Sequence, residues 1–287
     1  MTKQTVLHKI LQYPLTKIVI GLVLIAGLVF FTEWSGRKLS TYLSLPEGLK
    51  NIIISIADSV ISLAGYVILY RFYEKRRITE LSFSDLGKNA VTGFSIGLIL
   101  QSLFILVIYV TGNYLITGVN PVSFVIPALT TSLTAGFVSE IMIRGIVFRL
   151  IEKEFGTINS LILFIIIFAF FHINVEGANF LSVLATAMQA GFLLSAAYVF
   201  TRSLWFTIFL HFAWDFAEPG IFGAINPGNL IGQSLISCQI SGPRILTGGQ
   251  LGPQNSIQAL ILCTFIGILF VWLAKNKGNL IKPYWKS

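Results

Sequence analysis

Six ionisable side chains interrupt the long apolar stretches of this sequence: Asp58, Glu140, Arg144, His172, His211 and Asp215. Ionisable groups in such apolar surroundings are costly, so each is a candidate functional residue. Glu140 and Arg144 are four residues apart and therefore share one face of a helix. His211 and Asp215 repeat that spacing. Two histidines and two carboxylates on nearby helices could activate a water as a general base, bind a metal ion or relay protons.

Each of these residues also has a purely structural interpretation. Glu140 and Arg144 can neutralise each other as a buried ion pair. His172 follows an apolar run and can donate to a backbone carbonyl at the membrane interface. For Asp58 we favour a polar contact between helices, since it has no partner in any motif. The functional interpretation rests on the convergence of several such groups in a weakly charged chain.

The elements that position these residues follow from the composition. The chain has 287 residues, of which 55% are hydrophobic and 11% charged, and its mean hydropathy is +0.80. Because soluble domains carry about a quarter charged residues, this composition excludes an ordinary cytosolic enzyme, a disordered protein and a nucleic-acid-binding domain. A helical span needs about 20 apolar residues. We therefore expect one integral-membrane domain over residues 1–287, with an all-α, polytopic transmembrane helical bundle.

Eight spans are predicted, at about residues 10–32, 50–71, 90–111, 123–146, 158–172, 180–200, 204–216 and 257–274. The fourth is expected to continue as a helix past Arg149 and Lys153. A loop at 112–121 separates the third span from the fourth. The candidate residues, apart from Asp58, lie in a core at about 123–216.

The basic residues predict the orientation of the bundle. With eight spans, 16 Lys and Arg fall on the side of the termini and 4 on the other. Because cytoplasmic loops are enriched in Lys and Arg, both termini are predicted to be cytoplasmic. The 40-residue connection 217–256 then lies outside; with eight Gly and four Pro it predicts a functional loop such as a lid, or a poorly ordered one. We expect a bacterial plasma membrane.

Three motifs in order carry a family resemblance. The segment Ser139-Glu140-Ile141-Met142-Ile143-Arg144, then Phe168-x-x-x-His172, then His211-x-x-x-Asp215, resembles the CPBP (Abi) family. These are membrane endopeptidases related to the CaaX prenyl protease and to bacteriocin-processing and immunity proteins. Their pattern is Glu-Glu-x-x-x-Arg, Phe-x-x-x-His and His-x-x-x-Asn or Asp. The stretch 247–253 also resembles a segment that follows the third motif in some bacterial members.

The resemblance implies that a glutamate and a histidine activate water for attack on a peptide bond. It assigns Glu140 to the second glutamate of the first motif, Arg144 to its arginine and His172 to the activating histidine. His211 and Asp215 would then stabilise the tetrahedral oxyanion. An ionised Asp215 would repel that oxyanion, whereas a protonated one would donate to it.

The first glutamate of the family pattern falls on Ser139, and a serine hydroxyl is no general base at neutral pH. Four outcomes follow. Glu140 could take over the role of general base, although it is rotated by about 100° from Ser139 along the helix. A water-bridged Ser139 could instead support His172 as the sole base. Alternatively, the protein no longer cuts peptides, or Ser139 is a nucleophile paired with His172. We rank the nucleophile last because no acid orients it.

The leading hypothesis is an integral-membrane endopeptidase whose substrate is a membrane-associated peptide or lipid-anchored protein tail; membrane lipid is the other expected partner, and nucleic acid is not one. It requires Glu140, His172 and His211 around one polar cavity. Alternatives are a catalytically decayed scaffold or immunity protein, and a proton-coupled transporter, for which the sequence lacks the expected internal repeat. No cofactor is expected; zinc on His172, His211 and Glu140 is possible but not favoured.

Overall fold

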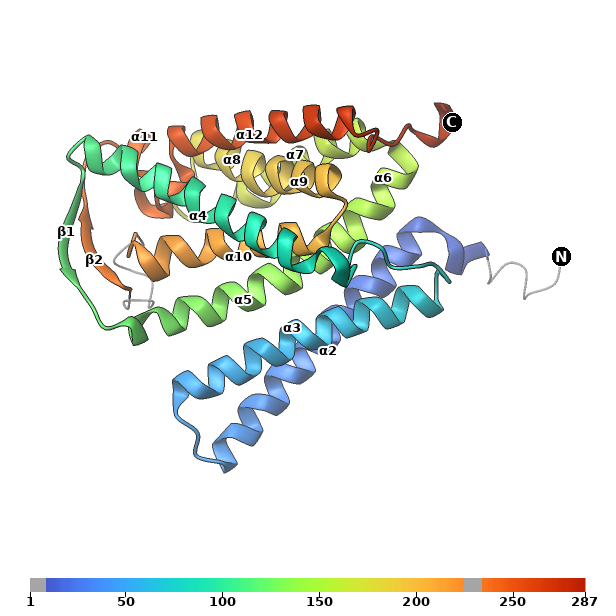
Figure 1. Ribbon diagram of the computed structural model, residues 1–287, viewed down its shortest axis with the longest axis horizontal. Coiled ribbons are helices and arrows are strands. Elements are labelled where there is room, and N and C mark those ends of the chain that lie inside the picture. Colours follow the sequence, from blue (N-terminus) through green and yellow to red (C-terminus); the bar gives the residue numbers. More distant parts are fainter. Residues whose placement is uncertain (1–8, 225–233, 287) are drawn as a thin grey trace.

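The computed structural model describes residues 9–224 and 234–286, and it is a bundle of helices with one small sheet (Figure 1). Part of the predicted outer loop, residues 225–233, lies outside the described residues. The helices are α2 (Pro14–Tyr42), α3 (Glu47–Phe72), α4 (Leu86–Val110), α5 (Ile126–Glu140), α6 (Arg149–Phe155), α7 (Thr157–His172), α8 (Phe180–Thr186), α9 (Leu194–Thr201), α10 (Leu204–Phe216), α11 (Arg244–Thr247) and α12 (Ile257–Asn276).

The polytopic helical bundle predicted from the sequence is confirmed. Within the described ranges, six helices are long and apolar enough to cross a membrane: Pro14–Tyr42, Glu47–Phe72, Phe83–Val110, Val122–Phe155, Phe180–Thr201 and Ile257–Asn276. The other two predicted spans correspond to the shorter helices α7 and α10, of 16 and 13 residues. The start of α2 and the C-terminal segment lie at one end of the bundle (Figure 1).

Three π-helical stretches interrupt or extend the central helices. The first, η3 (Ile141–Phe148), joins α5 to α6, and the second, η4 (Ala187–Leu193), joins α8 to α9. The third, η5 (Ala217–Ile221), continues α10 beyond its predicted end at residue 216. Because a π turn takes up an extra residue, it rotates the side chains that follow it, and such turns are frequent at functional sites.

Helix α10 lies between α4 and α5, which approach it through glycines. A Cβ added at Gly93 or Gly97 of α4 would lie 2.3 Å or 2.4 Å from a backbone oxygen of α10. A Cβ at Gly136 of α5 would lie 3.0 Å from the Phe212 Cβ. Small residues of this kind allow the backbones of membrane helices to pack closely. The contacts fix the position of the helix that carries His211 and Asp215.

The start of α10 is held by the segment that follows α3. The Leu204 amide donates to the Glu80 carbonyl oxygen at 2.8 Å. The buried Glu80 carboxylate in turn accepts from the Arg76 Nη1 at 3.0 Å and from the Tyr66 hydroxyl. Burial alone would raise the pKa of Glu80, but hydrogen bonds and the charge of Arg76 outweigh it and lower that pKa.

A two-stranded antiparallel sheet lies at the opposite end of the bundle from the C-terminus (Figure 1). It pairs β1 (Tyr114–Val119) with β2 (Ile236–Ile240), and Tyr114 lies opposite Ile240. Both segments were predicted as loop, so the sequence prediction was wrong here. The β-branched and aromatic residues of β1 favour a strand, but its partner lies more than a hundred residues further along the chain. The connection 217–256 is therefore partly ordered by strand pairing.

We predict that Gly97→Ala destabilises the protein because the new methyl group would overlap the Leu210 carbonyl oxygen. Overpacking of this kind typically costs about 1–3 kcal/mol, measurable as a lower melting temperature in detergent. Gly87→Ala on the same helix is the matched control, since nothing lies within 4 Å of its added Cβ. Equal melting temperatures for the two variants would contradict the close packing of α4 on α10.

Candidate active site

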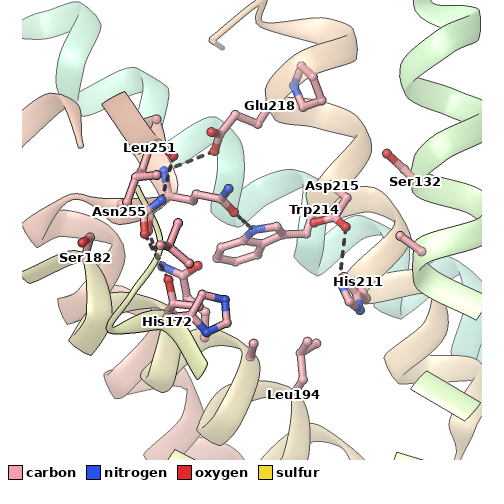
Figure 2. A pocket seen from close by; sticks show the side chains of 18 of the residues that line it. Ser132, His172, Ser182, Leu194, His211, Trp214, Asp215, Glu218, Leu251 and Asn255 are labelled. Carbon is pink, nitrogen blue, oxygen red and sulfur yellow. Dashed lines mark hydrogen bonds and ion pairs between the residues drawn. The ribbon is translucent and has the colours of Figure 1, made fainter. Parts of the chain in front are cut away.

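A cavity of about 560 Å³ lies between α5, α7, η4, α10 and the segment 250–255 that precedes α12. His172, His211, Asp215 and Glu218 all line it. Figure 2 shows His172 on one side of this cavity and His211 with Asp215 on another. The volume lies in the range of small-molecule and peptide sites. The structure thus brings three of the four predicted catalytic residues to one cavity, whereas Glu140, which the single-site hypothesis also requires there, does not line it.

His172 lies at the end of α7 and its hydrogen bond selects a tautomer. Its Nδ1 is 2.8 Å from the carbonyl oxygen of Phe168, one turn earlier on the same helix. Since a carbonyl oxygen only accepts, Nδ1 must carry the proton, and Nε2 of the neutral ring keeps its lone pair. The ring also stacks on Phe168, with an interplanar angle of 14°. His172 is therefore oriented with one basic nitrogen available.

His211 lies between two carboxylates. Its Nδ1 is 2.8 Å from the Glu140 Oε1, and its Nε2 is 3.2 Å from the Asp215 Oδ2. The Ser139 hydroxyl is 3.2 Å from the same Nδ1 and also donates to the carbonyl oxygen of Ala135. Because carboxylates accept, a ring with a proton on both nitrogens satisfies both of them.

Glu140 and Arg144 form the buried ion pair that their spacing predicts, with the Arg144 Nη1 2.9 Å from the Glu140 Oε1. Both residues are completely buried. Arg144 also donates to the Ala190 carbonyl oxygen in η4 and lies 5.5 Å from the centre of the Phe168 ring. Glu140 is absent from the cavity lining. The pair ties α5, α7, η4 and α10 together around the site.

Glu218 is a cavity residue that the sequence analysis missed. Its buried carboxylate accepts from the Gln101 Nε2 at 3.0 Å and from the Gln254 backbone amide at 3.2 Å. The spacing contained a signal, because Glu218 follows His211 by seven residues and Asp215 by three on one helix face. The predicted helix ends at residue 216, before Pro219 and Gly220, whereas η5 continues it to Ile221. Through Gln254, Glu218 holds the segment 250–255 against the cavity, and this segment overlaps the stretch 247–253 that resembles a family segment.

The remaining predicted residues lie elsewhere. Asp58 is completely buried in α3 and does not line the cavity. In the part of the chain that the structure describes, no three His, Cys, Asp or Glu side chains form a group that could hold a metal ion. Glu140 and His211, two members of the zinc alternative, are instead hydrogen-bonded to each other.

Comparison with known protein families supports the sequence resemblance. Residues 121–217 match the family model described as type II CAAX prenyl endopeptidase Rce1-like. This range contains all three motifs, from Ser139 to Asp215, and confirms the predicted resemblance to the CPBP and CaaX proteases over that segment. No curated protein and no solved structure matches the chain.

We predict that Arg144→Met strongly destabilises the fold, because it removes the guanidinium from the buried Glu140 carboxylate and leaves His211 as its remaining partner. Breaking a buried ion pair typically costs about 3–5 kcal/mol, which an unfolding titration in mixed micelles would measure. The double variant Glu140→Leu with Arg144→Met removes both charges and should lose less stability than the single variant. A single variant as stable as the wild type would contradict the structural role of the pair.

Proposed function

Starting from a segment similar to the type II CAAX prenyl endopeptidases, we propose that the protein is an intramembrane endopeptidase in which His172 activates the attacking water. The observation that carries this proposal is the geometry of the cavity. It holds two histidines from different helices, and their hydrogen bonds suit them to opposite roles in hydrolysis.

His172 suits the role of general base. Its Nδ1 proton is held by the Phe168 carbonyl oxygen, so Nε2 can accept a proton from a water in the cavity. The water oxygen then bonds to the carbonyl carbon of the scissile peptide. When the tetrahedral intermediate collapses, the same proton passes to the leaving nitrogen and the carbon–nitrogen bond breaks.

His211 suits the role of oxyanion donor. Glu140, itself fixed by Arg144, holds the proton on the His211 Nδ1 and sets the ring orientation. The Nε2–H faces Asp215 and can turn its hydrogen bond to the developing oxyanion of the substrate. Glu140 is therefore a positioning residue in this proposal, since it acts through His211 and does not line the cavity.

The Ser139 position fits this division of roles. The Ser139 hydroxyl donates to the Ala135 carbonyl oxygen, and the side chain does not line the cavity, which disfavours a serine nucleophile. Of the outcomes weighed for the missing first glutamate, the contacts favour His172 as the sole base, but the Ser139 hydroxyl that was expected to support it contacts His211 instead. The same substitution is the observation that favours a decayed, non-catalytic scaffold, so the two readings need a direct test.

We predict that the purified protein cleaves fluorogenic peptides and that His172→Ala lowers kcat by about 10²–10⁴-fold, the usual contribution of a general base. The substrates should include prenylated CaaX tails and unlipidated membrane-proximal sequences. Phe171→Ala is the matched control, because that neighbouring ring is 71% exposed and does not line the cavity.

Equal rates for wild type and His172→Ala would contradict the assignment of the base. A wild type that cleaves none of these substrates, together with a Ser139→Glu variant that does, would show that the cavity is intact and the catalyst lost. That result would support the scaffold reading.

A further inference from the structure

The cavity lies toward one end of the bundle. Besides residues of α5, η4 and α10, its lining includes the end of α7, Val175 and Ala178 in the link after it, the start of α8, η5 and the segment 250–255. These parts all lie toward the end that carries the β1–β2 sheet, away from the C-terminal segment (Figure 1). The cavity therefore lies nearer to one surface of the membrane than to the other. The distribution of Lys and Arg indicates which surface that is.

The two ends of the bundle differ in basic residues. The end away from the sheet carries most of those that the structure describes, in the links and helix ends around Arg71, Lys75, Arg76, Arg77, Lys88, Arg149, Lys153, Arg202, Lys275, Lys277 and Lys282. The sheet end has Arg37, Lys38, Lys50 and Arg244. Lys and Arg accumulate on the cytoplasmic side of membrane proteins. The end with the cavity is accordingly the non-cytoplasmic one.

Two of the basic residues at the sheet end are also neutralised locally. Arg37 is 2.7 Å from Glu33, and Lys50 is 2.5 Å from Glu47. By contrast, three exposed residues at the other end, Arg71, Lys75 and Arg77, have no ion pair within the described chain. Arg76, Arg149 and Arg202 at that end are ion-paired as well, so the inference rests on the number of basic residues and not on their pairing.

A groove continues from the cavity along the same face. It has a volume of about 910 Å³ and shares four lining residues with the cavity: Ala178, Ala224, Gln250 and Gly252. Its far wall is the end of β2 and the residues after it, from Cys238 to Gly242. Strand edges and glycine-lined walls suit an extended polypeptide, which can pair its backbone with a strand. The groove thus leads from the non-cytoplasmic surface to His172 and His211.

We infer that the cavity opens on the non-cytoplasmic face and that the substrate is an exported polypeptide segment, which enters in extended form along β2. The substrate part of this inference rests on the proposed peptidase activity. A prenylated tail displayed in the cytoplasm would lie on the wrong side of the membrane for this site.

Cysteine labelling in intact cells tests on which side of the membrane the cavity opens, and it does not depend on catalytic activity. In a Cys238→Ser parent, which keeps only the completely buried Cys263, single cysteines are placed at Val175 and Thr79. Val175 lines the cavity, and Thr79 is an exposed neutral residue at the opposite end. A membrane-impermeant maleimide should label Val175→Cys in intact cells, and label Thr79→Cys only after the membrane is opened. The reverse pattern would overturn the inference.

Sequencing of new N-termini in cells with wild type or His172→Ala tests the substrate class. Cleavage sites that depend on His172 should map to non-cytoplasmic segments, and sites in cytoplasmic tails would overturn the inference. If no cleavage site depends on His172 while the labelling pattern is as expected, the proposed peptidase activity and its substrate are contradicted. The non-cytoplasmic position of the cavity is then still supported. The two failures are thereby distinguishable.

Discussion

The buried ion pair of Glu140 and Arg144 is the interaction on which the geometry of the site depends. Removing two charges from water is costly, and the cost is offset only when the pair is close and further hydrogen-bonded. Here the pair is 2.9 Å apart, Arg144 also binds the Ala190 carbonyl oxygen, and Glu140 also binds His211. Four helical elements meet at these two side chains. A shift of η4 or α10 would remove one of the hydrogen bonds that this buried pair makes to its neighbours.

The same ion pair explains why the Glu140 carboxylate does not line the cavity. Spacing places Glu140 and Arg144 on one helix face, and the structure shows that this face is turned toward packed neighbours. The residues that reach the cavity come from other positions, chiefly His172 at the end of α7 and His211 with Asp215 on α10. Close glycine contacts from Gly93, Gly97 and Gly136 hold α10 in place, so the site sits on a rigid element.

Much of the fold could be predicted because a membrane span is marked by the length of its apolar run. The β1–β2 sheet could not, since strand pairing joins segments that are far apart in sequence. Glu218 was missed for a local reason: Pro219 and Gly220 suggest a helix end, whereas the π turn η5 carries the helix past them. Spacing correctly paired His211 with Asp215, but the hydrogen bond from His211 to Glu140 joins two helices and has no local signature.

In the proposed mechanism His172 activates the water, while Glu140 only positions His211. The most direct test is the pH dependence of kcat/KM for wild type and Glu140→Gln, with melting temperatures to show that both are folded. We expect Glu140→Gln to lower the rate at every pH and to leave the ascending limb, which reports the free base, at the same pH. An ascending limb that disappears or shifts in Glu140→Gln would show that Glu140 is itself the base and would contradict this account.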